Sequence, residues 1–201
     1  MKEIKIDLKK INKNEIVLIA DYLNKGKVFV YPTDTIYGIG CLALNGPGMK
    51  KINRMKERKN VRAFIVLVNS INMVKKYCRV SQKQEKILKT IWPGPVTVIL
   101  ECKKDLPREI FGEKYDKAGK NTLGVRLPKN DFLIKIIKKT GAPIVSTSLN
   151  VQGGKILDRP VGLEKIFKKV LPDLVVDAGE LKGEASRIID IRDCENIKII
   201  R

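Results

Sequence analysis

The order of predicted secondary-structure elements constrains the fold of this chain most strongly. Short apolar segments typical of buried strands alternate from end to end with segments that carry apolar residues at helical spacing. The expected strands are 1–7, 28–31, 63–68, 96–100, 122–127, 144–147, 174–177, 187–191 and 197–200, and the expected helices are 14–24, 47–58, 70–78, 81–90, 130–139 and 161–170. No repeat or low-complexity linker interrupts this pattern. The sequence therefore predicts a single α/β domain over residues 1–201, with flanking helices around a mixed sheet.

The composition excludes several kinds of catalytic site. The sequence has no histidine, and its cysteines at 41, 78, 102 and 194 form no CxxC pair. A zinc site is therefore not expected, and Ser-His-Asp and Cys-His arrangements are impossible. No apolar run approaches the roughly 18 residues of a membrane span, so we expect a cytoplasmic protein without membrane contact. We therefore expect an enzyme of this composition to work by positioning its substrates, by neutralising their charge and with a metal ion as a further option.

The net charge of +19 is compatible with a polyanionic partner such as nucleic acid. However, 31 of the 41 basic residues are lysines, and they are spread along the whole chain. Such enrichment also follows from genome composition or a high growth temperature. RNA binding therefore stays an open alternative, and the ten arginines are the better candidates for specific roles.

Two short blocks have the residue types that bind an anionic nucleotide. Lys56-Glu57-Arg58 follows a helical pattern, and Ser146-Thr147-Ser148-Leu149-Asn150 follows a buried-strand pattern. Lysine and arginine neutralise phosphates, and a hydroxyl-rich turn donates hydrogen bonds to phosphate or carboxylate oxygens. The alternative for the first block is a solvated basic helix end, which the helix dipole favours.

Three further features suggest a second ligand or a structural role. Thr33 lies in the turn after the strand 28–31, where its hydroxyl contacts either a substrate or only its own backbone. Arg126 ends an apolar strand, where a cation needs a partner such as a structural ion pair. The segment Trp92-Pro93-Gly94-Pro95 is expected to be architectural, and the polar segment 103–120 is the best candidate for a mobile loop.

Taken in order, these blocks resemble the YrdC-like family, the threonylcarbamoyl-AMP synthases. The matching segments are residues 31–40, 56–58, 92–97, 125–126 and 146–150, with a weaker match at 186–189. The resemblance implies a twisted open sheet with a basic concave face, in the short single-domain form. It also implies a reaction in which L-threonine, bicarbonate and ATP give threonylcarbamoyl-AMP and pyrophosphate, for modification of position 37 of tRNA. Departures at Lys59, Ala63, Leu149 and Ala185 leave room for a less characterised group of paralogues, which tends to lose the lysine and the asparagine that this chain keeps.

The resemblance also implies roles for individual residues. Lys56 and Arg58 would be catalytic and hold the triphosphate. The other implied nucleotide contacts are Thr122, Ser148, Asn150 and Arg201, and the implied threonine contacts are Thr33, Arg126, Ser146 and Ser186.

The implied cofactor is Mg²⁺ bound with ATP, without a metal ligand from protein side chains. The implied partner is a tRNA threonylcarbamoyl transferase complex, and tRNA or double-stranded RNA is a further candidate. Two alternatives remain at this point: a non-catalytic protein of the same fold that binds double-stranded RNA or tRNA, and an enzyme that forms a different acyl- or carbamoyl-adenylate.

Overall fold

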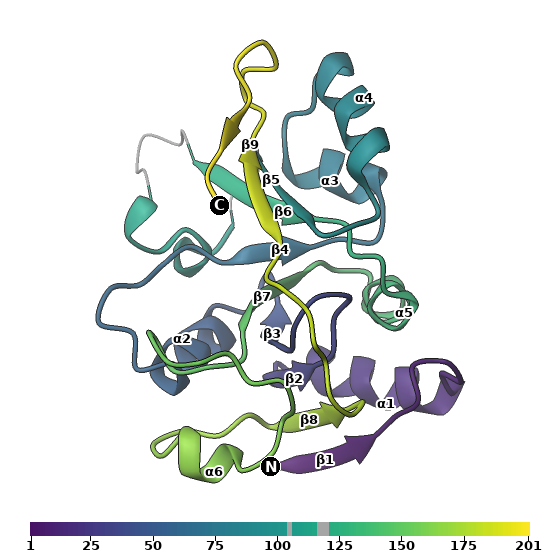
Figure 1. The fold of residues 1–201 in the computed structure, drawn as a ribbon, viewed down its shortest axis with the longest axis vertical. Helices are drawn as coiled ribbons and strands as arrows, with labels where there is room; N and C mark the ends of the chain where they lie inside the picture. Colours follow the sequence, from purple (N-terminus) through teal and green to yellow (C-terminus); the bar gives the residue numbers. More distant parts are fainter. Residues whose placement is uncertain (104–105, 116–120) are drawn as a thin grey trace.

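A single mixed sheet organises the molecule in the computed structural model, which describes residues 1–103, 106–115 and 121–201 (Figure 1). Its strands are β1 (Lys2–Lys5), β2 (Phe29–Tyr31), β3 (Gly38–Leu42), β4 (Ile65–Leu67), β5 (Val96–Glu101), β6 (Thr122–Arg126), β7 (Ile144–Ser148), β8 (Leu174–Asp177), β9 (Arg187–Asp190) and β10 (Lys198–Ile199). The helices are α1 (Lys13–Asn24), α2 (Gly46–Met55), α3 (Ile71–Tyr77), α4 (Gln82–Ile91), α5 (Asp131–Thr140) and α6 (Leu163–Ile166), with short 3₁₀ turns η1 (Arg108–Ile110) and η2 (Gly112–Lys114).

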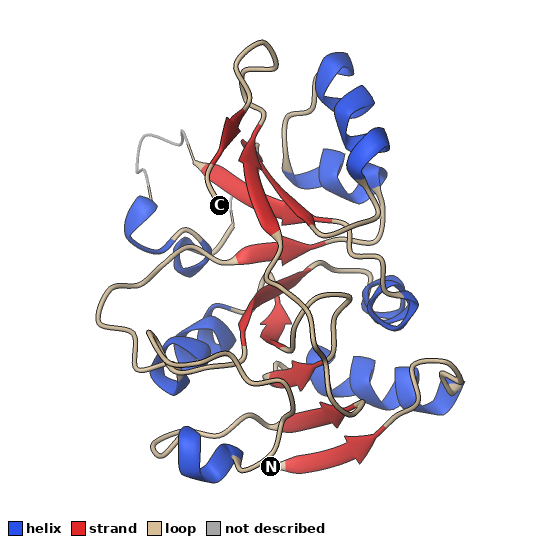
Figure 2. Cartoon of the chain, in the orientation of Figure 1, coloured by secondary structure: helices blue, strands red, loops and turns tan. Residues whose placement is uncertain are grey.

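The strand order shows that the sheet is mixed and open. Across the sheet the order is β1-β8-β2-β3-β7-β4-β6-β5-β9-β10. The pairs β1–β8, β2–β8, β4–β6 and β5–β9 are parallel, and the other pairs of neighbours are antiparallel. Helices lie along both sides of the strands (Figure 2). The α/β class with a mixed sheet and flanking helices is therefore confirmed.

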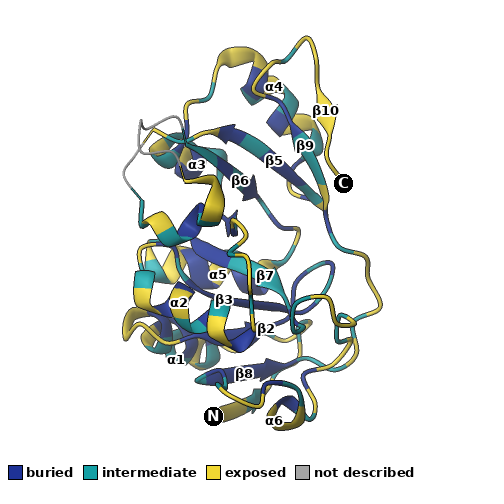
Figure 3. Cartoon of the chain, turned by 90° about the vertical axis from the view of Figure 1, so that its left-hand side faces the viewer, coloured by how far each residue is buried: buried dark blue, intermediate teal, exposed yellow. Residues whose placement is uncertain are grey.

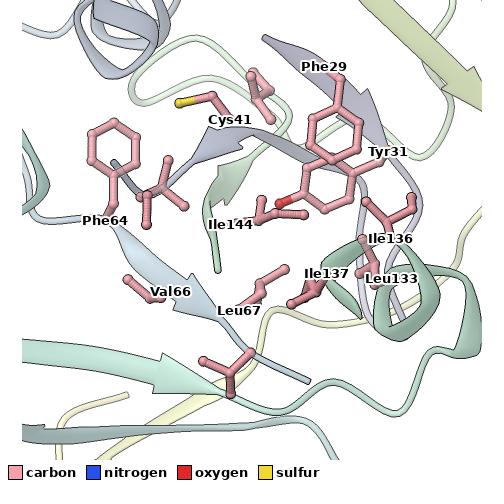
Figure 4. Close-up of a cluster of buried hydrophobic side chains, with 14 of the residues drawn as sticks. Phe29, Tyr31, Cys41, Phe64, Val66, Leu67, Leu133, Ile136, Ile137 and Ile144 are labelled. Atoms are coloured by element: carbon pink, nitrogen blue, oxygen red, sulfur yellow. The ribbon is translucent and has the colours of Figure 1, made fainter. Parts of the chain in front are cut away.

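The core lies between the central strands and the helices that cover them. Strands β2, β3 and β8 are almost fully buried, whereas exposed residues gather on the outer sides of α1, α2 and α4 (Figure 3). Leu133, Ile136 and Ile137 of α5 lie beside Ile144 of β7 (Figure 4). Their spacing along α5 is that of one helix face, so the apolar stripe of this helix packs against the sheet.

Side-chain caps fix the helix starts where the sequence predicts them. The side chains of Ser70, Ser81 and Asn130 each accept a hydrogen bond from the backbone amide three residues later. α5 ends at Gly141, whose φ of 69° is in the left-handed region that glycine adopts without strain. Among the described residues, no helix combines the length and apolarity needed to cross a bilayer.

Strand β3 was not predicted from the sequence, and three predicted elements differ from the observed structure. Of the helix expected over 161–170, only α6 forms, because the backbone leaves the helical conformation at Phe167, which has a φ of −100° and a ψ of 69°. The helix expected over 47–58 ends at Met55. The segment 103–120 is not entirely a solvated loop, because it contains η1 and η2 and buries Ile110 and Phe111 in the core. Residues 104–105 and 116–120 lie outside the described structure.

Candidate active site

A cavity of about 340 Å³ brings the separated sequence blocks together. Nine of the ten residues to which the resemblance assigned a role line this cavity, all except Thr122. Thr122 begins β6 opposite Glu101 of β5, and its nucleotide contact stays a prediction. Lys56, Arg126 and Ser148 come from three distant parts of the chain, and all three line this cavity. The convergence on which the sequence interpretation depended is therefore present.

Strand order explains how the two hydroxyl-bearing blocks meet. β7 lies between β3 and β4, so Ser148 pairs with Gly38 of β3, and Ser146 pairs with Ile65 of β4 and Gly40 of β3. The β3 glycines allow close approach, because a Cβ at Gly40 would lie 2.2 Å from the carbonyl oxygen of Val145. The end of β7 and the turn after β2 thus face the same cavity.

The end of α2 directs the basic block toward this cavity. The amide of Glu57 donates to the carbonyl oxygen of Arg54 at 3.1 Å, and the amide of Arg58 donates to that of Asn53 at 3.1 Å. These two bonds form a Schellman motif, in which Glu57 takes the left-handed position with a φ of 49°. A non-glycine residue pays roughly 1 kcal/mol for this conformation. In return the chain reverses at once, and both Lys56 and Arg58 line the cavity.

The Lys56 ammonium is buried in a shell of oxygen atoms. Its Nζ donates to the carbonyl oxygens of Ser148 and Asn150, both at 2.6 Å, and to Oδ1 of Asn150 at 2.8 Å. Its residue is only 3% exposed. Burial, with a smaller contribution from the charge on Arg58, lowers the pKa of Lys56 to about 7. The triphosphate contact implied for Lys56 stays a prediction.

Arg58 is held by polar and aromatic neighbours. Its guanidinium donates to Oδ1 of Asn53 at 2.9 Å and to Oγ1 of Thr147 at 2.9 Å, and it also donates to the carbonyl oxygen of Arg62 at 3.2 Å. It stacks over the ring of Phe64 at 4.9 Å. Burial, followed by the charge on Arg62, lowers the pKa of Arg58 to about 10. These contacts orient the side chain but provide no countercharge.

Arg126 has the structural ion pair that the sequence left open. Its Nη2 contacts Oδ1 of Asp34 at 2.6 Å, its Nη1 donates to Oγ1 of Thr35 at 2.9 Å, and its Nε donates to the carbonyl oxygen of Gly94 at 3.0 Å. Asp34 also accepts the amide of Lys129. The two side chains of the ion pair are 6% and 11% exposed. Contact of Arg126 with a substrate carboxylate stays a prediction.

Thr33 has the local hydrogen bonds that the sequence also allowed. Its Oγ1 contacts Oγ1 of Thr35 at 2.9 Å, donates to the carbonyl oxygen of Ile36 at 2.7 Å and accepts the amides of Thr35 and Ile36. The turn 33–36 is therefore a preformed network beside Arg126. Substrate contact by Thr33 stays a prediction.

Ser186 and Arg201 close another wall of the cavity. The hydroxyl of buried Ser186 contacts Oγ1 of Thr97 at 2.9 Å, and the carbonyl oxygen of Ser186 accepts Nη2 of Arg201 at 2.8 Å. The backbone of Arg201 also pairs with that of Ile188. These hydrogen bonds hold Arg201 in place among the residues that line the cavity.

The charge of the cavity wall is one-sided. Five cationic side chains occur among the described lining residues, and none of those residues is an aspartate or glutamate: Lys56, Arg58, Arg62, Arg126 and Arg201. Asp34 compensates Arg126 from outside this lining. The cavity thus has an excess of positive charge that suits an anionic ligand.

Sequence reasoning missed the groups that orient the arginines. Asn53, Thr147 and the carbonyl of Gly94 hold Arg58 and Arg126. Asn53 and Thr147 had a signal, because each lies within or next to a block already singled out. The role of Gly94 had none, because residue type does not show where a backbone carbonyl points. The surrounding segment is nevertheless architectural as expected, with the indole Nε1 of Trp92 donating to Val96.

Fold and cavity together define an α/β protein with a preformed cavity whose described lining carries positive charge. A family model for Sua5, YciO and YrdC proteins, described as "Telomere recombination", matches residues 21–201. The chain therefore belongs to the Sua5/YciO/YrdC family.

Known relatives include both named enzymes and a protein without a stated activity. A Methanocaldococcus jannaschii protein with a provisional threonylcarbamoyl-AMP synthase name is 30% identical, and the alignment covers 96% of this chain and 90% of the relative. The structure of Pyrococcus abyssi Sua5 complexed with L-threonine superimposes with a TM-score of 0.84 at 25% identity, covering 100% of this chain. This chain spans only 56% of that protein. The structure of Escherichia coli YciO also gives a TM-score of 0.84, at 26% identity, with 100% of this chain and 93% of YciO covered.

Proposed function

We propose that this protein is an L-threonylcarbamoyladenylate synthase, a nucleotidyltransferase that makes threonylcarbamoyl-AMP and pyrophosphate from L-threonine, bicarbonate and ATP. Its product would serve a tRNA threonylcarbamoyl transferase complex that modifies position 37 of tRNA. The names of the relatives and the threonine complex of P. abyssi Sua5 support this function. The observation that carries the proposal is the cavity in which, among the described lining residues, five cations meet a hydroxyl-rich turn and no carboxylate occurs.

The reaction needs little covalent chemistry from the protein. The amine of threonine and bicarbonate condense to a carbamate with loss of one water molecule. A carbamate oxygen then attacks the α-phosphorus of ATP, while the bond from that phosphorus to the bridging oxygen of pyrophosphate breaks. Two anions must be held together during this step, and charge builds on the leaving pyrophosphate. Positioning supplies up to roughly 7–11 kcal/mol of such a barrier. Each preorganised donor at a developing charge adds about 3–4 kcal/mol. A cavity without histidine is adequate for this chemistry.

The two ligands would occupy different ends of the cavity. The triphosphate would occupy the end formed by Arg58, Arg62 and the turn at Ser148 and Asn150. This end suits an anion because the two arginines have no ion pair among the described residues. Arg126, with Thr33, Ser146 and Ser186, forms the end suited to a small zwitterion, in agreement with the resemblance. Arg201 lies at the rim next to Ser186 and is a further candidate for the nucleotide.

Magnesium would enter the site with ATP. Among the described residues, no group of three or more His, Cys, Asp or Glu side chains is placed to hold a metal ion. The donor set of the cavity consists of cations, hydroxyls and amides, so Mg²⁺ would bind mainly to phosphate oxygens and neutralise part of their charge.

Of the alternatives, the comparisons favour the synthase over a non-catalytic RNA-binding protein. The similarity to YciO makes a paralogue the closer competitor. Lys56 and Asn150, the two residues that the paralogue group tends to lose, are both present and hydrogen-bonded to each other here. This retained pair supports the synthase.

Pyrophosphate release tests the proposal. The purified protein with Mg²⁺ and ATP should release pyrophosphate only when L-threonine and bicarbonate are both present, and mass spectrometry should identify threonylcarbamoyl-AMP. Replacing threonine with serine, alanine and valine in turn separates this function from that of another adenylate former. Absence of release under conditions in which an established synthase is active would overturn the proposal.

A further inference from the structure

The Lys56 ammonium has no hydrogen available for a second set of partners. A lysine ammonium carries three N–H donors and no acceptor. In this structure it makes three short contacts, to two carbonyl oxygens and one side-chain oxygen of the 148–150 turn. Arg58, by contrast, uses three of its five N–H groups within the described structure. The two cations of this block are therefore in different situations.

The hydrogen bonds to the Lys56 ammonium also stabilise the 148–150 turn. The carbonyl oxygens of Ser148 and Asn150 converge on one point with Oδ1 of Asn150, and a buried carbonyl without a donor costs about 1–3 kcal/mol. The backbone strengthens the link, because the carbonyl oxygen of Lys56 accepts the amide of Gln152 at 2.9 Å. Four hydrogen bonds thus join the end of α2 to a turn more than 90 residues away in sequence.

The braced turn presents its side chains to the cavity. Oγ of Ser148 donates to Oδ1 of Asn150 at 2.7 Å, and Nδ2 of Asn150 donates to the carbonyl oxygen of Gly154 at 2.7 Å. Ser148, Asn150, Gln152 and Gly153 all line the cavity. Since Asn150 contacts both Lys56 and Ser148, the position of the Ser148 hydroxyl depends on the ammonium.

We propose that Lys56 is a positioning residue, which acts on the nucleotide by shaping the 148–154 turn and not by direct contact with the triphosphate. Arg58 and its neighbour Arg62 then provide the direct phosphate contacts. The inference rests on the proposed function for its affinity measurements, whereas hydrogen exchange tests without any ligand whether Lys56 holds the 148–154 turn in place.

Hydrogen–deuterium exchange gives the ligand-free test. In Lys56→Met, which keeps the length of the side chain but removes its donors, the amides of 149–154 should exchange at least about tenfold faster, as expected for loss of hydrogen bonds worth about 1.4 kcal/mol or more. Lys59→Met is the matched control, because it removes the same charge from an exposed site three residues away. Unchanged exchange in Lys56→Met would overturn the proposal.

A double-mutant cycle on ATP binding gives the second test. Lys56→Met and Asn150→Ala each disturb the same turn, so each should weaken ATP binding about tenfold. The double variant should bind ATP at most about twofold more weakly than the weaker-binding single variant. The KM for ATP should rise while the KM for threonine changes little, which a general folding defect would not produce. If the two losses multiply to about a hundredfold, Lys56 contacts the phosphates independently and the proposal is wrong.

Failure of the proposed function and failure of a variant to fold can each be told apart from failure of this proposal. If the wild-type protein does not bind ATP, the proposed function fails while the exchange comparison still decides whether Lys56 holds the turn. If Lys56→Met does not fold, Lys56→Gln keeps two N–H donors and no charge, and it should recover part of the exchange protection. Loss of all protection in a folded Lys56→Gln protein would contradict a hydrogen-bonding brace.

Discussion

The two ends of the cavity differ in how far the protein itself compensates their positive charge. At one end, Arg126 is compensated by Asp34 and surrounded by acceptors from Thr35 and Gly94. At the other end, Arg58 and the exposed Arg62 have no carboxylate beside them among the described lining residues, and burial, followed by the charge on Arg62, lowers the pKa of Arg58. The first end is electrostatically complete in the protein alone. The second is completed only by an anion.

This difference separates stability from function. A compensated, hydrogen-bonded ion pair is costly to break, because the remaining partner is left buried and uncompensated. An uncompensated cation stores unfavourable energy that ligand binding relieves. We therefore expect substitutions at the Arg126 end to damage folding and activity together, and those at the Arg58 end to damage activity alone.

The largest effect should come from Arg126→Met. The substitution leaves Asp34 buried without its countercharge, which costs about 3–5 kcal/mol of unfolding free energy, and it should reduce kcat/KM by at least about 100-fold. Urea unfolding and pyrophosphate release measure the two losses. Lys83→Met is the matched control, because it breaks an ion pair with Glu195 that is more than 70% exposed on both sides and worth less than about 1 kcal/mol.

The combination of Arg126→Met with Asp34→Asn sharpens this prediction. Removing the stranded carboxylate should restore a large part of the lost stability without restoring activity. A loss in Arg126→Met no larger than that in Lys83→Met would show that the Asp34 pair does not hold this end of the cavity.

Arg58→Met should have the next largest effect, and on activity alone. We expect pyrophosphate release to fall by about 100-fold through loss of a donor to the phosphates, with unfolding free energy unchanged within about 1 kcal/mol. Arg54→Met on the same helix removes an equal charge from an exposed position and should leave the rate unchanged. A stability loss in Arg58→Met as large as that in Arg126→Met would remove the contrast between the two ends.

The pH dependence of nucleotide binding should be moderate. Since the pKa of Lys56 is about 7 in the free protein and a bound anion raises it, the affinity for ATP should be highest below pH 7. It should then fall by up to about tenfold per pH unit as the pH rises. Calorimetry on wild type and Lys56→Met gives a difference that removes the ionisation of ATP itself. Equal pH dependence in the two proteins would contradict this account.

The same lowered pKa has the opposite sign for folding. Between pH 7 and 10.5 the unfolded chain binds more protons at Lys56 than the folded protein does, so the stability contribution of this group rises with pH across that window. Urea unfolding of the ligand-free protein, with Lys56→Met as reference, measures this slope. A contribution that falls with pH would show that the folded environment favours the charged form.

The smallest effect should follow Glu57→Gly at the end of α2. Glycine adopts the left-handed conformation without strain but is more flexible when unfolded, so the unfolding free energy should change by less than about 1 kcal/mol. Glu57→Val should instead lower it by about 1–2 kcal/mol, since a β-branched residue fits this conformation poorly. Thermal unfolding compares the two. Equal losses in both would mean that the conformation of the backbone does not direct Lys56 and Arg58.

Much of the fold and of the site was predictable from sequence because local chemistry specifies it. Ser70, Ser81 and Asn130 mark helix starts through their caps, and β-strand segments show as apolar runs. The ordered blocks predicted which residues meet in the cavity. In contrast, α6 was predicted too long, because the apolar spacing after Gly162 is typical of a helix, whereas the backbone leaves the helical conformation at Phe167.

The contacts that decide the role of each site residue were less predictable. The sequence does not pair Asp34 with Arg126, and only the fold shows that these two side chains form an ion pair. The three acceptors around Lys56 are contributed by the backbone and by a residue 94 positions away. Residue type alone gives no information on such long-range geometry.

Calorimetric titration with pyrophosphate and with L-threonine tests the division of the cavity most directly. The account predicts that both ligands bind at the same time, and that Arg58→Met weakens pyrophosphate binding at least about tenfold while threonine affinity stays within about twofold. Competition between the two ligands, or an equal loss of both affinities in Arg58→Met, would contradict it.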